Sequence, residues 1–276
     1  MRFGCHLSIK NGFLGAAKQA YEMGAGAFQY FSKNPRSLGV KEFQLEDATL
    51  CKQFCEEKDI LSVIHSPYPT TLTPKTNKKR EAVLASLHND LVIADACGSI
   101  GVVVHFGKQL EPEKPLQSYQ LMIEILNEVL VGWDGQAKIL LENTGGLPGT
   151  IGTTLDELAQ VRNLCQEQEK IGFCFDTCHA FASSLWDGDN WQEVMERGNE
   201  LAYFDHLEVI HLNNSKYATG TGKDRHAPIF NQGYILETQF NDILTTPQLR
   251  DIPFILETPK EEVPHEKEIA MLQEKW

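Results

Sequence analysis

Nine side chains able to bind metal ions stand at or just after the ends of short apolar segments in this 276-residue sequence. They are five histidines, two aspartates and two glutamates: His65, His105, Glu142, Asp176, His179, His211, Asp224, His226 and Glu257. Imidazole and carboxylate together suit zinc, manganese or iron. Nine groups exceed what one ion needs. At three or four ligands each, with one carboxylate shared, they suit about three divalent ions.

The apolar segments that precede these residues alternate with helical patterns along the chain. The near-continuous hydrophobic runs are typical of buried parallel strands and lie at Arg2–His6, Ala27–Phe31, Leu61–His65, Gly101–Phe106, Lys138–Glu142, Gly172–Asp176, Glu208–Leu212 and Pro253–Glu257. Between them we expect helices at Gly15–Met23, Leu45–Lys58, Lys79–Ala96, Leu116–Val131, Leu155–Glu169 and Trp191–Asp205. Eight strands alternating with helices predict an α/β protein of the (β/α)8 TIM barrel class.

The domain organisation follows from the same alternation. No low-complexity or Pro/Gly/Ser-rich segment divides the chain, so we expect a single catalytic domain over residues 1–276. A doubly wound open sheet is the runner-up. It is disfavoured because no G-x-G-x-x-G turn follows the first strand.

In such a barrel the C-terminal ends of all strands face one mouth, where active sites are built. The nine side chains would therefore converge although they are far apart in sequence. A lone histidine at a strand end is more often an ordinary hydrogen-bonded residue than a ligand, and only the joint placement favours metal. His6 ends the first strand and is interpreted as a group that supports ligands. His88 and His265 are expected on the surface.

Composition limits the function classes. The net charge is −13 and the pI about 5.1, which argues against a general nucleic-acid binder because phosphate contacts need Lys and Arg. The cations nevertheless gather near loops of the expected mouth, so we predict a basic mouth on an acidic body. The residues concerned are Lys33, Arg36, Lys75, Lys78, Lys79, Arg80, Lys108, Lys216, Lys223 and Arg225.

Localisation is inferred from three sequence features: the cysteine spacing, the N-terminal residues and the length of the apolar stretches. The seven cysteines show no secreted spacing pattern, and the N-terminal residues lack the apolar core of a signal peptide. No stretch approaches the roughly 20 apolar residues of a membrane span. We expect an intracellular, cytoplasmic protein with no membrane association.

Several motifs resemble the endonuclease IV family. Asp176-Thr177-Cys178-His179 resembles its D-T-C-H signature, and His211-Leu212-Asn213, continuing to Asp224-Arg225-His226, resembles its H-x-N…D-R-H signature. Glu142-Asn143-Thr144 and Leu256-Glu257-Thr258 resemble its strand-end E-N-T and L-E-T motifs. The resemblance spans nearly the whole chain.

The resemblance implies three metal ions, most often zinc, with manganese or iron as alternatives at one site. By position, His65, His105 and Glu142 would hold the first ion. Glu142 would bridge to a second, completed by Asp176, His211 and Glu257. His179, Asp224 and His226 would hold the third.

The same resemblance implies the reaction and the partner. The family cleaves double-stranded DNA on the 5′ side of an abasic site, leaving a 3′-hydroxyl and a 5′-deoxyribose phosphate. Hydroxide formed at the metals is the nucleophile, with Glu142 and Glu257 as the catalytic carboxylates. Arg36 and Tyr68 match positions that contact DNA at the lesion. A monomer is expected.

A sugar isomerase or epimerase of the xylose-isomerase-like group is the alternative function. Such an enzyme needs a single ion, for which Glu142, Asp176, His211 and Glu257 would suffice. His65, His105 and His179, with the Asp224/His226 pair, discriminate against this alternative because they supply ligands for further ions.

Overall fold

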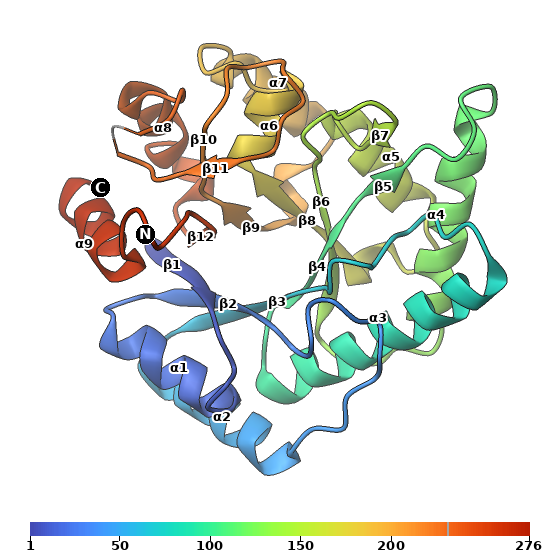
Figure 1. The fold of residues 1–276 in the computed structure, drawn as a ribbon, viewed down its shortest axis with the longest axis horizontal. Helices are drawn as coiled ribbons and strands as arrows, with labels where there is room; N and C mark the ends of the chain where they lie inside the picture. The colour runs from blue at the N-terminus through green and yellow to red at the C-terminus, as the bar shows by residue number, and fades with distance from the viewer. Residues whose placement is uncertain (231) are drawn as a thin grey trace.

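A closed barrel of eight parallel strands forms the centre of the molecule (Figure 1). The structure is a computed structural model that describes residues 1–230 and 232–276. The strands close in the order β1-β12-β9-β8-β6-β4-β3-β2. Their bounds are β1 Arg2–Leu7, β2 Ala27–Phe31, β3 Leu61–His65, β4 Gly101–His105, β6 Lys138–Glu142, β8 Ile171–Asp176, β9 Leu207–His211 and β12 Pro253–Leu256. The predicted TIM barrel is confirmed.

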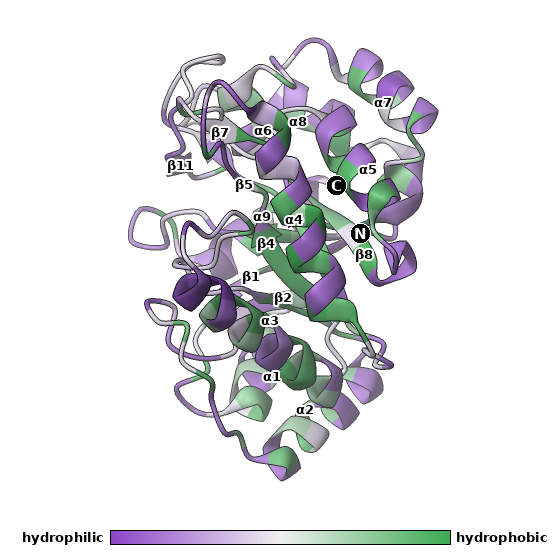
Figure 2. Ribbon diagram, turned by 90° about the vertical axis from the view of Figure 1, so that its right-hand side faces the viewer, coloured by the Kyte–Doolittle hydropathy of each residue, from purple (hydrophilic) through white to green (hydrophobic). Residues whose placement is uncertain are grey.

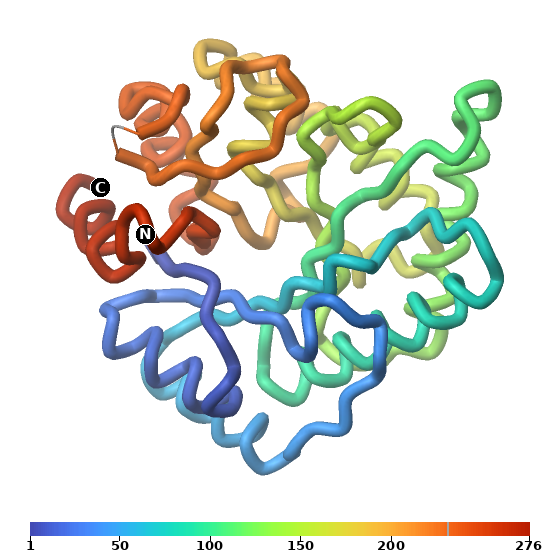
Figure 3. The backbone as a smooth tube through the Cα atoms, viewed as in Figure 1, coloured from blue at the N-terminus to red at the C-terminus, as the bar shows by residue number. Residues whose placement is uncertain are grey.

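Helices surround the barrel (Figure 1). The central strands are mostly hydrophobic, whereas the helices combine hydrophobic and hydrophilic residues (Figure 2). The helices are α1 Phe13–Glu22, α2 Leu45–Lys58, α3 Asn77–Cys97, α4 Pro115–Leu130, α5 Leu155–Leu164, α6 Thr177–Ser183, α7 Trp191–Glu200, α8 Glu237–Leu244 and α9 His265–Lys275. The chain ends lie close together (Figure 3), because α9 packs against β1 and Gln273 donates a hydrogen bond to the Gly24 carbonyl at 2.7 Å. None of the described helices is long and apolar enough to cross a membrane.

Two short antiparallel strand pairs lie on the loops at the mouth of the barrel. Strand β5 (Gly107–Lys108) pairs antiparallel with β7 (Thr150–Ile151). Strand β10 (Asn214–Ser215) pairs in the same way with β11 (His226–Ala227). The β10–β11 pair matters for the site because it returns the chain to the mouth and places His226 there.

The barrel interior is filled by an apolar layer of inward-facing side chains, one from each of seven strands. Its members are Ala27, Val63, Val103, Leu140, Cys174, Val209 and Ile255, and all are buried. On the eighth strand the equivalent place is held by Gly4, where a Cβ atom would lie 1.9 Å from the Ala27 carbonyl oxygen. Successive inward positions on a strand are two residues apart. The residues two further along each strand therefore form the next layer toward the mouth.

The strand bounds differ from the predicted ones by one residue at most, whereas two helices end five residues earlier than expected. Helix α5 ends at Leu164 because Cys165 has extended backbone angles and a short 3-10 turn follows (Gln168–Lys170). Helix α7 ends at Glu200, and Ala202 then has a φ of 54°, which breaks the helical path. Helices α6, α8 and α9 were not predicted.

Candidate active site

A polar layer lies directly above the apolar layer, two residues further along every strand. Its members are His6, Gln29, His65, His105, Glu142, Asp176, His211 and Glu257. Six of these eight residues belong to the predicted metal-ligand set. The layer therefore brings together predicted ligands that lie as much as 192 residues apart, from His65 to Glu257.

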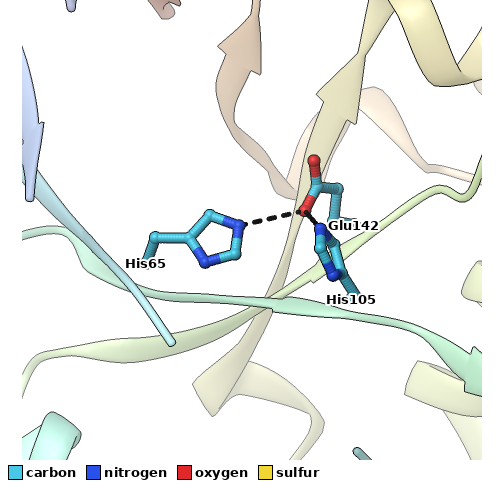
Figure 4. A group of neighbouring side chains, drawn as sticks. All are labelled: His65, His105 and Glu142. Carbon is cyan, nitrogen blue, oxygen red and sulfur yellow. Dashed lines mark ion pairs between the residues drawn. The ribbon is translucent and has the colours of Figure 1, made fainter. Parts of the chain in front are cut away.

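The first group of ligand atoms is formed by His65, His105 and Glu142 at the ends of β3, β4 and β6 (Figure 4). The two imidazoles point to the same carboxylate oxygen of Glu142: Nε2 of His105 lies 3.2 Å from Oε2 and Nε2 of His65 lies 3.5 Å from it. Glu142 is fully buried, and His105 is the most exposed of the three. Three donor atoms this close could supply three of the four positions of a tetrahedral site.

The second group shares Glu142 with the first and adds Asp176, His211 and Glu257. Nδ1 of His211 faces all three carboxylates, at 2.9 Å from Glu142 Oε1, 3.3 Å from Glu257 Oε2 and 3.8 Å from Asp176 Oδ2. Since one oxygen of Glu142 belongs to each group, its carboxylate is placed to bridge two ions.

The third group is formed by His179, Asp224 and His226. Each oxygen of the Asp224 carboxylate faces one imidazole, with Nε2 of His179 at 3.2 Å and Nε2 of His226 at 3.2 Å. Asp176 also approaches this group, at 3.9 Å from Nε2 of His226. All nine side chains predicted from the sequence thus converge on the mouth.

Hydrogen bonds to the backbone orient three of the imidazoles. The Nδ1 atoms of His65, His179 and His226 donate to the carbonyl oxygens of Ser66, Asn143 and Glu257, at 2.8, 2.9 and 3.1 Å respectively. A proton held on Nδ1 leaves the Nε2 lone pair free. In each case Nε2 faces a carboxylate, that of Glu142 for His65 and that of Asp224 for His179 and His226. This is the arrangement that metal-binding histidines usually have.

The electrostatics of the mouth also fit a cation. Oε2 of Glu142 and Nε2 of His226 are buried and make no well-directed hydrogen bond, although His105 Nε2 and Asp224 Oδ1, respectively, lie 3.2 Å from them. Buried polar atoms are normally hydrogen-bonded. Burial alone would lower the pKa of His226, but its pairing with Asp224 and the charges of Asp176 and Glu257 raise it to about 9. Burial would raise the pKa of Glu257, but His211 and His65 lower it to about 2. Protons thus balance the carboxylates, and divalent ions could replace those protons.

Two cysteines lie close enough to these groups to be considered as ligands, Cys174 beside Glu142 and His211, and Cys178 beside Asp224 and His226. Burial raises the pKa of both thiols, that of Cys174 to about 12. A neutral thiol is a poor ligand. The imidazole and carboxylate groups are therefore the better candidates.

Two asparagines that the sequence analysis did not single out connect the strand ends. Asn143 accepts a hydrogen bond from the Asp176 amide at 2.7 Å and donates to the Asp176 carbonyl at 3.0 Å. Asn213 donates to Oδ2 of Asp176 at 2.7 Å and accepts from the Glu257 amide at 2.8 Å. Asp176 also caps α6 by accepting from the His179 amide at 2.7 Å. Asn143 and Asn213 belong to the E-N-T and H-x-N motifs, respectively, and these motifs were the sequence signal that could have identified them.

Arg36 and Tyr68, the predicted DNA contacts, lie on neighbouring loops at the rim. The Tyr68 amide donates to the Pro35 carbonyl at 2.8 Å, which ties the loop after β3 to the loop after β2. Both side chains are exposed, Tyr68 to 64%. The Tyr68 ring packs edge-on against Phe31, with centroids 5.2 Å apart. A large exposed aromatic ring held by a neighbour is available for stacking.

The mouth opens into two adjoining cavities. The smaller, about 390 Å³, lies above the ligand groups and reaches from His6 and His65 to Glu257. The larger, about 890 Å³, extends past Tyr68 between the β3 and β6 loops and is lined by Lys75, Lys79 and Lys108. Tyr68, His105, His179 and Asp224 line both cavities.

Two expectations about the rim and the surface are wrong. Lys33 is not a free cation of the mouth: its Nζ is buried and donates to Asp90 Oδ1 at 2.8 Å and to the Ser86 carbonyl at 2.7 Å. His265 is not on the surface either. It is buried at the start of α9, and its Nε2 donates to the Thr258 carbonyl at 2.9 Å beside the mouth.

Comparison with known proteins identifies the class first. Residues 17–275 match the family described as xylose isomerase-like TIM barrel. Within this class the chain belongs to the endonuclease IV family. It is 38% identical over 271 residues to the "Probable endonuclease 4" of Symbiobacterium thermophilum, and the match covers 98% of both chains. The resemblance seen in the motifs is thereby confirmed.

Solved structures agree with this assignment. Endonuclease IV from Thermus thermophilus matches with a TM-score of 0.88 at 29% identity, covering 99% of this chain and 98% of that one. A D-tagatose 3-epimerase-like protein matches with a TM-score of 0.69 at 17% identity, covering 100% and 99%. The second similarity shows the fold alone and gives the isomerase alternative no additional support.

Proposed function

We propose that this protein is a metal-dependent endonuclease that hydrolyses the DNA phosphodiester on the 5′ side of an abasic site, leaving a 3′-hydroxyl and a 5′-deoxyribose phosphate. The observation that carries the proposal is the convergence of nine imidazole and carboxylate side chains at one barrel mouth, in a chain of the endonuclease IV family. A one-ion isomerase would need four of these nine.

Three divalent ions, zinc at most positions and manganese or iron as alternatives at one, would be held by the three groups. His65, His105 and Glu142 would hold the first, and Glu142, Asp176, His211 and Glu257 the second. His179, Asp224 and His226 would hold the third. The buried Glu142 Oε2 and His226 Nε2 atoms, which make no well-directed hydrogen bond, support this assignment. Such ions lower the pKa of bound water toward about 7 and stabilise negative charge on phosphoryl oxygens.

Glu142 and Glu257 are the catalytic carboxylates of the proposal. Glu142 has one oxygen in each of two ligand groups and no exposure to solvent, so it fixes their separation. Glu257 is 18% exposed at the edge of the smaller cavity, where it meets both the ligand groups and the space for substrate. It is therefore placed to orient a phosphate against the centre.

Recognition of DNA would begin at the rim. Arg36 can contact phosphates, and Tyr68 can stack in the gap left by a missing base. Lys75, Lys79 and Lys108 line the larger cavity and would follow a phosphate backbone. Moving a baseless nucleotide into the smaller cavity breaks no base pair, which favours abasic sites over intact ones.

The remaining properties follow from this assignment. Residues 1–276 would act as a single catalytic domain, since strands from Arg2 to Leu256 close one barrel and α9 packs back on β1. We expect a monomer that acts on double-stranded DNA in the cytoplasm without membrane association.

The test uses a duplex oligonucleotide that carries one abasic-site analogue and an end label. Zinc-loaded protein should cut it at one position, 5′ to the lesion, and prolonged chelation should abolish cutting until zinc is restored. The same duplex with an intact base is the control substrate and should stay uncut. Full occupancy of the centre without cleavage, together with turnover of a ketose or aldose, would overturn the proposal in favour of the isomerase.

A further inference from the structure

Gln29 is the one member of the polar layer that is neither an imidazole nor a carboxylate. It lies on β2, two residues after Ala27 of the apolar layer, and is fully buried. Its register partner on β1 is His6, also of this layer, and its register partner on β3 is Val63, two residues before His65. An amide cannot serve as a strong metal ligand beside imidazoles and carboxylates, so its place in this layer needs another explanation.

The Gln29 amide makes three hydrogen bonds within the layer. Its Nε2 donates to Glu257 Oε1 at 2.6 Å and to Nδ1 of His6 at 3.1 Å. Its Oε1 accepts from Nε2 of His211 at 2.8 Å. The side chain therefore connects two of the proposed metal ligands, which come from strands β9 and β12 on the other side of β1.

The chemistry of these partners determines which end of the amide faces which ligand. An ionised carboxylate only accepts hydrogen bonds. Were the amide reversed, its oxygen would lie against the Glu257 oxygen, and two acceptors would face each other at hydrogen-bond distance. The amide nitrogen must face Glu257, so the amide oxygen must face His211.

This orientation determines the protonation of His211. Because the amide oxygen can only accept, Nε2 of His211 must carry a proton. Nδ1 is then the one ring nitrogen that can release its proton and bind a cation. It is also the atom that faces the carboxylates of Glu142, Glu257 and Asp176. His211 differs in this from His65, His179 and His226, which present Nε2.

We infer that Gln29 is a positioning residue of the metal centre: it keeps the proton of His211 on Nε2 and holds Glu257 beside it, so that both ligands face one ion. This inference rests on the ligand set of the proposed function. Groups that orient metal ligands typically contribute about 10- to 100-fold to metal affinity.

The experiment measures zinc stoichiometry and affinity by competition with a chelator, in the full-length protein and in Gln29→Met. Methionine has a similar length and shape but removes all three hydrogen bonds. We expect one of the bound zinc ions to dissociate about 10- to 100-fold more readily, while the others keep their affinity. Wild-type affinity at every site in this variant would overturn the inference.

Tyr30→Phe is the matched control. Tyr30 is the next residue on β2 and is equally buried, and its hydroxyl shares a hydrogen bond with Ser99 at 2.9 Å, on the helix side of the strand. The control loses a buried hydrogen bond from the same strand without touching the polar layer. Its zinc affinity should equal that of the wild type. A loss equal to that of Gln29→Met would show a general effect of weakening β2 and would overturn the inference.

His211→Ala separates failure of the inference from failure of the proposed function. If this variant binds as many ions as the wild type, the ligand set itself is wrong. If it loses an ion while Gln29→Met loses none, the ligand set stands and only the role of Gln29 is overturned.

A measurement on the wild type keeps the inference testable if Gln29→Met does not fold. Nitrogen NMR of zinc-loaded protein with labelled histidines reports which ring nitrogen of each histidine carries the proton. We expect His211 to carry it on Nε2 and His65, His179 and His226 on Nδ1. A proton on Nδ1 of His211 would contradict the inference without any substitution.

Discussion

Two successive layers of the barrel interior are built by the same strands and differ only in chemistry. The lower layer consists of residues such as Val63, Val103 and Leu140, and the upper layer consists of His65, His105 and Glu142, two positions further along the same strands. The backbone geometry is therefore the same in both layers. What separates them is that the lower layer is stable by apolar burial, whereas the upper layer gathers charges that burial disfavours.

The comparison shows how the barrel divides stability from function. The lower layer needs nothing from outside the chain. The upper layer keeps Glu142 Oε2 and His226 Nε2 buried without well-directed hydrogen bonds, an arrangement that cations would stabilise. Substitutions in the upper layer should therefore change metal content and rate, whereas substitutions in the lower layer should change the free energy of unfolding.

The largest effect is expected for Glu142→Ala in the upper layer. Loss of the bridging carboxylate should remove zinc from two groups and lower kcat/KM on abasic DNA by more than about 10³-fold, because charge stabilisation at the reacting phosphate is lost. Steady-state cleavage and metal analysis on one sample check this. Glu208→Ala is the control: it removes a carboxylate on β9 that pairs with Lys138 on β6, and it should keep both the rate and the metal content. A near-normal rate with full metal content would show that Glu142 does not bridge.

Leu140→Ala in the lower layer should lower the free energy of unfolding and leave the metal content unchanged. Leu140 is fully buried beneath Glu142, and its truncation should cost about 2–5 kcal/mol of unfolding free energy because it leaves a cavity. Urea unfolding measures this cost. Zinc content and kcat/KM of the folded protein should stay close to wild type. A loss of metal as large as that of Glu142→Ala would show that the layers do not act separately.

Tyr68→Ala tests the rim, which belongs to neither layer. Stacking of an aromatic ring on nucleic acid contributes about 1–3 kcal/mol, so KM for abasic DNA should rise by about 5- to 150-fold. Zinc content should not change, because the ring packs on Phe31 and makes no hydrogen bond to a proposed ligand. Kinetics with abasic and single-stranded substrates check this. Metal loss in this variant would place Tyr68 in the centre instead.

The smallest effect concerns the pH dependence of stability in chelated protein. The pKa of His226 is raised to about 9 from 6.5, so its contribution to stability is present below pH 6.5 and is lost as pH rises through about 9. The pKa of Glu257 is lowered from 4.5 to about 2, so its contribution is present above pH 4.5 and is lost as pH falls through about 2. Urea midpoints should therefore be highest between about pH 4.5 and 6.5.

Leu140→Ala provides the control for this pH profile. It should lower the urea midpoint at every pH without changing the shape of the curve, because the lower layer contains no titrating carboxylate or imidazole. His226→Gln should flatten the decline on the alkaline side. A decline that persists unchanged in His226→Gln would mean that another group causes it.

Much of the fold and of the ligand set could be predicted because every second residue of a strand faces the barrel interior. Strand ends were located to within one residue, and six of the eight strands carry a predicted metal ligand at or directly after their end. The convergence of His65 with Glu257 then followed from the rule that strand ends share one mouth. Whether these side chains bind metal stays a prediction until metal is measured.

What could not be predicted depends on contacts between distant residues. Gln29 was overlooked because glutamine is not a typical ligand, although its position two residues after Ala27 marks the layer. Lys33 was expected at the rim, but Asp90 on α3 holds it inside. His265 was assigned to the surface because acidic residues surround it in sequence. The packing of α9 on β1, which buries it, has no local signature.

The most direct test of the central claim is anomalous diffraction at the zinc edge from crystals of zinc-loaded protein. The account predicts three peaks in the upper layer and its rim: one enclosed by His65, His105 and Glu142, one by Glu142, Asp176, His211 and Glu257, and one by His179, Asp224 and His226. A single peak at the second group, with the other two groups empty at saturating zinc, would contradict the account and indicate a one-ion enzyme.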